Sequence, residues 1–426
     1  MSSNAATSNR DAAAAEVLIV GAGIVGVCSA AYLQRAGFRV TLIDRLAPGN
    51  GCSFGNAGNV SPGAVVPYSM PGTLWNVPRW LLDPLGPLAV RPAHLPKLIP
   101  WLLRWMRASR PDNVRAISRA MLALHQPVFE GYLPLLKEAG APELIEMSGQ
   151  LYVSAKSGPM DSELARELRK TAGIRAEAIT GGALRELEPT LSGEYQTGLL
   201  LPDNGTCLNP QRLVQAIADH VRRNGAEILE GEVHSFRFGP DGPVAALTSL
   251  GEVRFKNLVL AAGAWSNRLS KQLGLDVPLE AERGYHITLT EPGLMPRLPV
   301  TNRDFSFATA PMEMGLRLAG TAEYGGLDAA PNWGRARVLL KHATRMYPGV
   351  ATSSFTEWMG HRPTLPDGLP IISRSSQHRN IVFAFGHSHF GVTGAPTTGR
   401  LVAELVANKP SNSIDLTPYS ASRFSA

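Results

Sequence analysis

The sequence contains 426 residues, of which 44% are hydrophobic and 18% are charged, so an intrinsically disordered chain is excluded and two or three domains are expected. The formal net charge of +6 includes no block of five like charges. It gives only weak support for a nucleic-acid-binding protein, and it suits an anionic small substrate or a membrane surface equally well. Three cysteines without a CxxC pair exclude a disulfide framework and disfavour a cysteine-rich zinc site; these counts indicate a cytoplasmic globular protein.

The first predicted element is a buried parallel strand at 16–20, an apolar and β-branched run (EVLIV). The small, polar stretch 1–15 before it lacks the regions of a signal peptide, and we expect it to be a disordered extension. The motif GAGIVG at 21–26 follows the strand directly. A helix, a second strand at 39–43 and Asp44 then complete the order of elements that a dinucleotide site requires.

Each residue of this motif has a separate physical role. Gly21 permits a tight turn, Gly23 lets backbone N–H groups approach a pyrophosphate, and Gly26 allows the helix to pack closely on the strand. We expect this helix to end at Gly37. Asp44 can accept hydrogen bonds from ribose hydroxyl groups. The alternative interpretation is a structural turn that binds no ligand.

The loop at 51–63 (GCSFGNAGNVSPG) follows the second strand and is rich in Gly, Ser and Asn. Such a loop exposes many backbone N–H groups, which suits the pyrophosphate and the ring edge of a flavin. Its composition also fits a merely flexible loop, so a nicotinamide or a flavin nucleotide remains open at this point of the chain.

Residues 74–106 are the one segment suited to contact with a membrane. The chain has no run of 18 apolar residues, which excludes a conventional transmembrane helix. Four of the seven tryptophans lie in this segment: Trp75, Trp80, Trp101 and Trp105. Prolines break it into short pieces that could lie in a bilayer interface, with Arg79, Arg91 and Arg104 facing lipid phosphates. The alternative is a proline-rich cap packed on the protein's own core.

The C-terminal half supplies further elements for a nucleotide site. The run at 258–266 (LVLAAGAWS) predicts a buried strand followed by small residues that allow a nucleotide to lie close to the chain. A strand at 381–385 leads into the glycine-containing loop 386–393, and a helix is expected at 395–407. The N-terminus of that helix can stabilise the negative charge that develops at the pyrimidine end of a reduced flavin. Because the supporting elements are spread over the whole chain, FAD is favoured over a nicotinamide.

Five motifs, in this order along the chain, resemble those of the FAD-dependent D-amino acid oxidase/dehydrogenase superfamily: GAGIVG at 21–26, SFGNAG at 53–58, LAAGAWS at 260–266, GHRPTLPDGLPII at 360–372 and GHSHFGVTGAP at 386–396. The resemblance covers nearly all of 16–415. It implies an α/β fold (α+β in its substrate domain) of the glycine oxidase/D-amino acid oxidase type, with a Rossmann-like FAD-binding domain and a discontinuous, mixed-sheet substrate domain. The stretches 282–287 (ERGYHI) and 311–333 resemble the bacterial D-amino acid dehydrogenase branch and, within it, glyphosate oxidoreductases.

The resemblance also implies how the chain divides into domains. The FAD-binding domain is expected at 16–90, 195–265 and 345–415. The substrate domain is expected at 91–194 and 266–344, with a helical region near 112–190 and strands from about 280 to 325, and 416–426 is a tail.

The resemblance assigns the cofactor contacts to positions that match the motifs of the family. The ADP half of FAD would contact Gly21, Gly23, Ile24, Val25, Gly26, Asp44 and Arg45. The pyrophosphate and the flavin would contact Ser53, Asn56, Ala57, Gly58 and Asn59. The adenine, the ribityl chain and the pyrimidine end would contact Val233, Ala262, Gly263, Trp265, Gly386, Gly391, Val392 and Thr393. Sarcosine oxidase-type relatives tether the flavin through a cysteine near the C-terminus, whereas the last cysteine here is Cys207, so we expect noncovalent FAD. No metal is expected.

Candidates for the substrate site come from residue chemistry. A guanidinium group binds a substrate carboxylate with two hydrogen bonds, and the candidates are Arg317, in a predicted strand, and Arg362, in a predicted rigid turn. The alternative role of Arg362 is structural. Tyr285 and His389 could add hydrogen bonds, and His286 or His389 could accept the amine proton. His389 stands where several oxidases of the superfamily have a basic residue.

The resemblance implies oxidation of the C–N bond of a D-amino acid or of an N-substituted glycine (glyphosate- or sarcosine-like) to an imine, which water hydrolyses to a 2-oxo acid and an amine. The alternatives are a D-proline or hydroxy-D-proline dehydrogenase, a flavin enzyme of the same fold such as an RNA-modifying domain, and a nicotinamide dehydrogenase. Oxygen or a quinone would accept the electrons, and no nucleic-acid partner is expected. Peripheral attachment to the cytoplasmic face of the inner membrane stays open.

Overall fold

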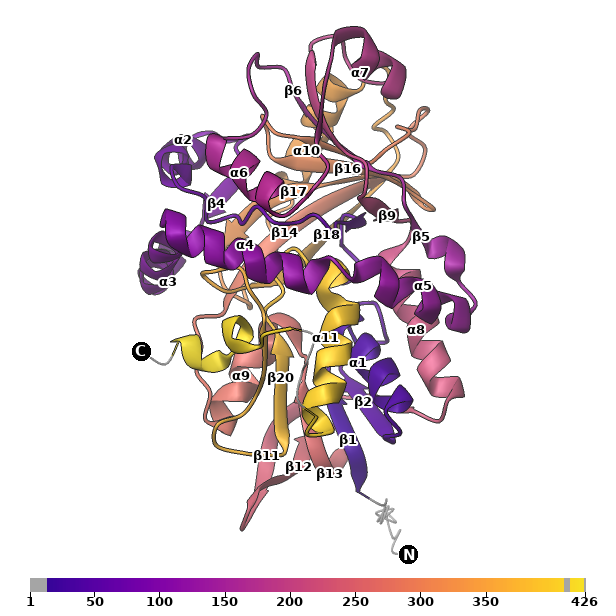
Figure 1. The fold of residues 1–426 in the computed structure, drawn as a ribbon, viewed down its shortest axis with the longest axis vertical. Coiled ribbons are helices and arrows are strands. Elements are labelled where there is room, and N and C mark those ends of the chain that lie inside the picture. The colour runs from indigo at the N-terminus through magenta and orange to yellow at the C-terminus, as the bar shows by residue number, and fades with distance from the viewer. Residues whose placement is uncertain (1–13, 410–413, 425–426) are drawn as a thin grey trace, which may run out of the picture.

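The computed structural model describes residues 14–409 and 414–424. The stretch predicted to be a disordered extension, 1–15, lies outside the described residues except for its last two positions. The described chain forms two large β-sheets at opposite ends of the molecule, with helices around and between them (Figure 1). The predicted α/β class is therefore confirmed.

The first sheet contains the strand–glycine–helix unit predicted from the N-terminal motif. Its parallel part has the order β10-β2-β1-β13-β20, and antiparallel pairs add β19, β12 and β11. The strand bounds are β1 Ala15–Val20, β2 Val40–Asp44, β10 Glu227–Glu230, β11 Val233–Gly239, β12 Gly242–Thr248, β13 Gly251–Leu260, β19 Ile371–Arg374 and β20 Ile381–Phe385. The strands predicted at the N-terminus and before the C-terminal glycine loop are thereby confirmed.

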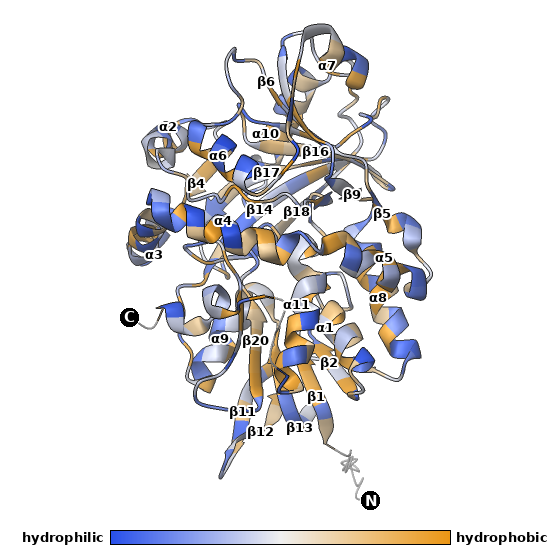
Figure 2. Cartoon of the chain, in the orientation of Figure 1, coloured by the Kyte–Doolittle hydropathy of each residue, from blue (hydrophilic) through white to orange (hydrophobic). Residues whose placement is uncertain are grey.

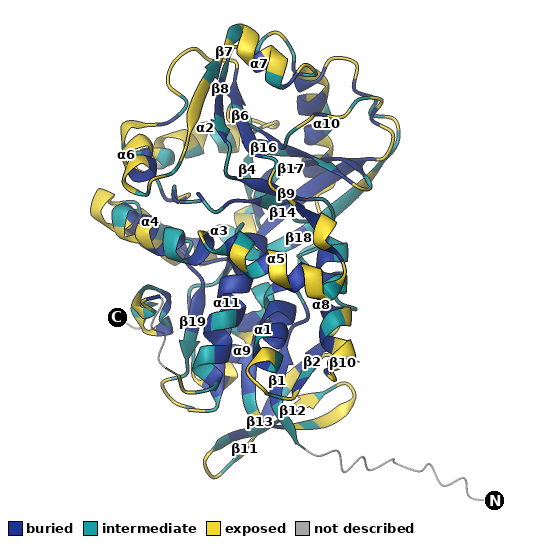
Figure 3. Ribbon diagram, turned by 45° about the vertical axis from the view of Figure 1, so that its right-hand side comes forward, coloured by how far each residue is buried: buried dark blue, intermediate teal, exposed yellow. Residues whose placement is uncertain are grey.

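Four helices form the core on one face of this sheet: α1 (Ile24–Arg35), α5 (Val128–Ala139), α8 (Pro210–Arg223) and α11 (Gly391–Val406). Figure 2 shows apolar residues along β1, β20 and α11, and Figure 3 shows α1 and α11 as mostly buried. At Gly399 in α11, an added Cβ would lie 2.7 Å from the carbonyl carbon of Cys28 in α1. The absence of a side chain therefore lets these two helices pack in close contact.

Helix α11 begins at Gly391, whereas the sequence predicted a start at 395. The prediction was late because Gly394 and Pro396 are typical of loops. Pro396 has no N–H group to donate to the carbonyl of Val392, and the hydroxyl group of Tyr132 donates to that carbonyl instead, over 2.7 Å. A contact from α5 thus compensates for the proline inside the helix.

The second sheet is mostly antiparallel and has the order β18-β14-β17-β16-β15-β6-β8-β7, with β4 paired to β17. Its bounds are β4 Leu88–Val90, β6 Gln150–Ser154, β7 Glu177–Thr180, β8 Thr197–Leu201, β14 Glu280–Leu289, β15 Val300–Asn302, β16 Phe307–Met312, β17 Gly315–Tyr324 and β18 Phe355–Thr364. Helix α10 (Gly334–Met346) buries one face of β14 and β17. The predicted strands between 280 and 325 are confirmed.

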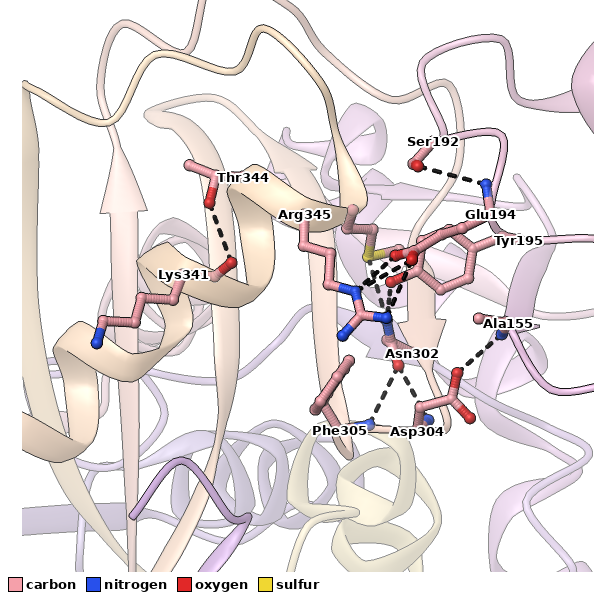
Figure 4. A network of polar contacts seen from close by, with 11 residues as sticks. Ala155, Ser192, Glu194, Tyr195, Asn302, Asp304, Phe305, Lys341, Thr344 and Arg345 are labelled. Carbon is pink, nitrogen blue, oxygen red and sulfur yellow. Dashed lines mark hydrogen bonds and ion pairs between the residues drawn. The ribbon is translucent and has the colours of Figure 1, made fainter. Parts of the chain in front are cut away.

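A polar network joins α10 to the far end of this sheet (Figure 4). Arg345 in α10 donates to the Glu194 carboxylate over 2.8 Å, and the Asn302 amide donates to the Tyr195 hydroxyl over 2.8 Å. The other Asn302 amide atom, Oδ1, accepts from the N–H of Asp304 over 2.9 Å. None of these residues lines the large cavity described below, so we interpret the network as structural.

Sheet membership differs from the predicted domain segments in several places. Strands β4, β8 and β18 belong to the second sheet, although their residues were grouped with the FAD-binding segments. Conversely, α5 packs in the core of the first sheet, although it was grouped with the substrate domain. Arg362 lies in the strand β18 and not in the predicted turn. The region near 112–190 contains β6 and β7 as well as helices. The division into domains stays a prediction.

The remaining helices lie between the sheets or at their edges: α2 Val77–Leu82, α3 Leu95–Ala108, α4 Pro111–His125, α6 Glu163–Thr171, α7 Gly181–Leu187 and α9 Ser266–Ser270. A small third sheet consists of β3 (Asn59–Val60), β9 (Gly205–Cys207) and β5 (Ile145–Glu146). Among the described residues, no helix is both long enough and apolar enough to cross a bilayer.

Candidate active site

A cavity of about 360 Å³ lies at the carboxyl ends of the parallel strands, where open α/β sheets bind their ligands. Fifteen of the predicted cofactor residues line it: Gly21, Gly23, Ile24, Val25, Asp44, Arg45, Ser53, Asn56, Val233, Ala262, Gly263, Trp265, Gly386, Gly391 and Val392. Segments from five separate parts of the chain thus meet around one cavity. The cavity lining does not include the predicted residues Gly26, Ala57, Gly58, Asn59 and Thr393.

The glycines of the N-terminal motif are required for two different reasons. At Gly21, an added Cβ would lie 2.3 Å from the carbonyl oxygen of Ala261. At Gly26, it would lie 1.9 Å from the carbonyl oxygen of Gly21. The chain's own packing therefore excludes side chains at these two positions. At Gly23 an added Cβ would meet only the Ser53 hydroxyl, at 3.4 Å. The protein itself leaves room there, and a ligand in the cavity can use this space.

Polar groups are arranged along the cavity in a way that suits a dinucleotide. The N-terminus of α1, at Ile24, borders the cavity and favours an anionic group. The Asp44 carboxylate is fixed at the end of β2, since its Oδ2 accepts from the Ala22 N–H over 2.7 Å. Farther along, the Arg45 guanidinium lies over the Trp265 ring, 3.9 Å from its centre.

An ion-pair cluster lies beside this cavity and is centred on the buried Glu282 of β14, whose partners are half-buried. Arg362 is directly opposite Glu282 on β18, and its Nη1 donates to Glu282 Oε1 over 2.7 Å. His389 Nε2 lies 3.1 Å from the same oxygen. The neighbour of Arg362, Pro363, lines the cavity and accepts a hydrogen bond from the Ser388 N–H over 3.0 Å. This contact connects β18 to the C-terminal glycine loop and explains why two residues far apart in the sequence meet.

Charge stabilises the Glu282 carboxylate. Burial alone would raise the pKa of this group, but His389 and Arg362 together lower the pKa of Glu282 to about 2. The carboxylate is therefore ionised at any physiological pH.

The chain matches the model of the family described as FAD dependent oxidoreductase over residues 16–405. It belongs to that family. The chain is 39% identical to a D-amino-acid oxidase of Bradyrhizobium diazoefficiens over 96% of this chain and 98% of that protein. It is 30% identical to a D-amino acid dehydrogenase of the same organism over 96% and 99% of the two chains. The crystal structure of glycine oxidase from Geobacillus kaustophilus superposes with a TM-score of 0.71 at 23% identity, over 96% of this chain and 98% of the other.

The family confirms that the enzyme uses FAD, and the cavity residues fit this cofactor. Gly23 and the α1 N-terminus can hold the pyrophosphate, and Asp44 can accept from the ribose. An added Cβ at Gly263 would meet nothing within 4 Å, and one at Gly391 would meet only side chains at 3.9 Å or more. Like Gly23, these two positions therefore leave space that a ligand can use.

Arg317 is fully buried and lies on the same face of the second sheet as Arg362, but it forms no hydrogen bond with Glu282, Arg362 or His389. Its Nη1 donates to the carbonyl oxygens of Phe54 and Asn56, each over 2.9 Å, and Nε donates to Thr288 over 3.4 Å. Burial lowers the pKa of Arg317 to about 10, so it remains a cation at neutral pH, and it pairs with no carboxylate among the described residues. Arg317 therefore positions the loop 53–58, and substrate binding by this side chain would require that these contacts break.

The other two aromatic candidates lie on opposite faces of β14. His286 is stacked on Trp358, with ring centres 5.0 Å apart. Burial, and then the Arg317 charge, lower the pKa of His286 to about 3, which makes it a weak proton acceptor at neutral pH. Tyr285 points to the α10 side, where its hydroxyl donates to the Glu323 carboxylate and accepts from the Asn332 N–H. The structure thus brings Arg362 and His389 together and separates Tyr285 from them.

Sequence reasoning missed two residues of this site, Glu282 and Trp358. The alternation of side chains along β14 could have identified Glu282, because Glu282 lies on the same face of this strand as Gly284 and His286. Trp358 fills the space above Gly55 and Gly360, where an added Cβ would lie 1.8 and 1.9 Å from its ring. No group of three or more His, Cys, Asp or Glu side chains within the described ranges could hold a metal ion.

Proposed function

We propose that this protein oxidises the C–N bond of a D-amino acid to an imine, and that it binds the substrate at the Glu282–Arg362–His389 cluster. The observation that carries this proposal is the Arg362 side chain. Its Nη1 is bound to Glu282 and to the Thr321 carbonyl, while its Nε and Nη2 groups have no hydrogen-bond partner among the described residues. These donors can take a substrate carboxylate with two hydrogen bonds.

The same cluster offers a partner for the substrate amine. The ionised Glu282 carboxylate attracts an ammonium group, so a zwitterionic amino acid matches the pair of opposite charges. When bound, FAD supplies the two-electron oxidation of the amine. The resulting imine reacts with water to give a 2-oxo acid and ammonia, or an amine when the nitrogen is substituted.

His389 is the residue best suited to remove the proton of the substrate ammonium. Its Nε2 lies 3.1 Å from the Glu282 carboxylate, so we assign a ring proton to Nε2, which donates to that carboxylate. The other ring nitrogen, Nδ1, is buried and has no hydrogen-bond partner among the described residues. It can therefore accept a proton.

We propose that FAD is bound noncovalently. All three cysteines are free, and only Cys52 lines the cavity. Burial raises the pKa of Cys52 to about 11, so its thiol stays protonated and is a poor nucleophile. After acid precipitation of purified enzyme, the yellow colour should be in the supernatant, and flavin that remains in the protein pellet would refute noncovalent binding.

The substrate class can be tested by following 2-oxo acid formation with an artificial electron-accepting dye. The substrates are D-alanine, D-proline, sarcosine, glyphosate and L-alanine. The relatives named D-amino-acid oxidase and D-amino acid dehydrogenase support the first substrate. Resemblance at 311–333 supports the N-substituted glycines as a second class. Activity with L-alanine alone, or with none of these compounds, would contradict the proposal.

Oxygen or a quinone would accept the electrons in the cell. Release of hydrogen peroxide by the enzyme in air, compared with reduction of a soluble quinone analogue, distinguishes the two acceptors. A quinone dissolved in lipid would require contact with a bilayer, and we propose a cytoplasmic enzyme that attaches peripherally to the inner membrane.

A further inference from the structure

The segment that contains α2 and α3 exposes an unusual number of large apolar side chains. We define the α2–α3 face by the exposed side chains Trp75 (88% exposed), Leu82 (84%), Leu95 (45%), Ile99 (48%), Leu103 (57%) and Met106 (37%). Figure 1 shows α2 and α3 at the same edge of the molecule, on its left side. Exposed apolar side chains that no described part of the chain covers are typical of an interaction site.

The face follows from the sequence of α3. Leu95, Ile99 and Leu103 are spaced by four residues, so they form one stripe along the helix. The opposite side of α3 is anchored, because Leu98 and Trp101 are buried and the Trp101 indole N–H donates to the Thr364 carbonyl over 3.3 Å. Trp101 is therefore buried in the protein, and the interpretation that it lies in a bilayer interface was wrong. The exposed stripe is not needed for this anchoring.

The basic residues of this segment indicate that its partner is anionic. Residues 73–110 contain six basic residues and one acidic residue, Asp83, so five of the chain's six net positive charges lie in this segment. Of the basic residues, Arg79, Lys97, Arg104, Arg107 and Arg110 are exposed, and none of these five forms an ion pair with a carboxylate of the described chain. Arg91 differs, because it donates to Glu323 over 2.8 Å.

We propose that the α2–α3 face docks on the surface of an anionic lipid bilayer. The apolar side chains would enter the interface while the unpaired basic residues meet the lipid phosphates. A second copy of this chain fits the face less well, because pairing two such faces would bring like charges together. The proposal goes beyond the oxidation reaction and does not depend on which amino acid is the substrate.

The helix α3 that carries this face also contacts the strand that carries Arg362 of the candidate active site. Trp101, on the anchored side of α3, binds the carbonyl of Thr364, two residues along β18 from Arg362. Docking would therefore hold the candidate active site close to the bilayer, where a lipid-soluble acceptor is concentrated.

The test is co-sedimentation of FAD-loaded enzyme with vesicles of phosphatidylcholine alone or mixed with phosphatidylglycerol. The variants are Ile99→Ser/Leu103→Ser for the apolar stripe and Lys97→Gln/Arg104→Gln/Arg107→Gln for the charges. The matched controls are Phe238→Ser/Leu250→Ser, which removes exposed apolar side chains near the β11 and β12 turns, and Arg39→Gln/Arg222→Gln/Arg254→Gln, which removes three exposed charges elsewhere. FAD content and dye-linked activity without vesicles report whether each variant is folded.

We expect wild type and both controls to bind the anionic vesicles at low salt and to be released at high salt. Each α3 variant should bind at least about tenfold more weakly, with unchanged FAD content. In the charge variant each lost basic residue contributes roughly fivefold in affinity, and in the apolar variant the buried apolar area is lost. Wild-type enzyme that ignores anionic vesicles, or α3 variants that bind as well as wild type, would overturn the proposal. A wild-type dimer that becomes monomeric in Ile99→Ser/Leu103→Ser would also overturn it and assign the face to a second copy.

If the α3 variants lose FAD, a fluorescence measurement on wild-type enzyme tests the docking proposal instead. Lipids brominated on their acyl chains should quench the fluorescence of Trp75 in wild-type enzyme, and the difference from Trp75→Phe isolates this residue. Absence of that quenching would contradict docking by this face.

Discussion

The Arg362 guanidinium donates to the Glu282 carboxylate over 2.7 Å from the directly opposite position on the neighbouring strand. The side chains fit because Gly284 leaves space for Arg362: an added Cβ there would lie 2.2 Å from the guanidinium carbon. A cation and an anion are therefore held side by side next to the FAD cavity, and the proposed recognition of a zwitterionic substrate depends on this pair.

Replacing Glu282 with Gln should weaken binding of the substrate amine. Charged hydrogen bonds contribute about 1.5–3 kcal/mol, so we expect KM for the best D-amino acid to rise about 10- to 100-fold while FAD content stays unchanged. The matched control is Glu357→Gln, on the same strand as Arg362, which removes an ion pair with Arg337 at the surface. An unchanged KM in Glu282→Gln would show that Glu282 does not bind the substrate amine.

Arg317→Met should affect the cofactor rather than the substrate. Because Arg317 holds the carbonyl groups of Phe54 and Asn56, losing two hydrogen bonds to a charged group should weaken FAD binding about tenfold or more. KM measured with saturating FAD should change little. The opposite result, a large increase in KM with unchanged FAD affinity, would restore Arg317 as a substrate-binding residue.

Gly23→Val should abolish FAD binding without unfolding the protein. An added Cβ at this position meets only Ser53, so the valine methyl groups would occupy the cavity and not the core. Purified variant should be colourless with a circular dichroism spectrum like that of wild type. The control is Gly182→Ala, where an added Cβ meets nothing within 4 Å. A yellow variant at full stoichiometry would mean that the pyrophosphate binds elsewhere.

Stability should decrease as the pH falls below about 6.5, the ordinary pKa of histidine. Burial lowers the pKa of His387 to about 3 and that of His125 to about 4. Between these values and 6.5 the unfolded chain binds more protons than the folded chain, so acid favours unfolding. His387→Gln should flatten the fall of the unfolding temperature with decreasing pH relative to wild type. A slope equal to that of wild type would contradict this assignment.

The sequence predicted those parts of the site that depend on local backbone geometry. The strand, the glycine turn and Asp44 form a continuous unit whose steric requirements can be read from residue types. Arg362 was also found, but its strand was taken for a turn, because Gly360, Pro363 and Pro366 resemble turn signals. Its pairing with β14 depends on a register that no local pattern reveals.

Side-chain partners that come from distant strands could not be predicted. Glu282 was overlooked because its role depends on Arg362 and His389, which are distant in the sequence. Arg317 was correctly placed in a strand, but alternation does not show that the loop 53–58 covers that strand. Tyr285 is adjacent to His286, and this very adjacency puts the two side chains on opposite faces.

The central claim, that the enzyme oxidises D-amino acids, is tested most directly by anaerobic titration of FAD-loaded enzyme. The flavin absorbance is recorded after addition of D-alanine or other D-amino acids, with the L-enantiomers as controls. We predict that at least one D-amino acid bleaches the flavin fully with one equivalent of 2-oxo acid formed, and that its L-enantiomer does not. Flavin that stays oxidised with every D-amino acid, or that is bleached by the L-enantiomers alone, would contradict the account.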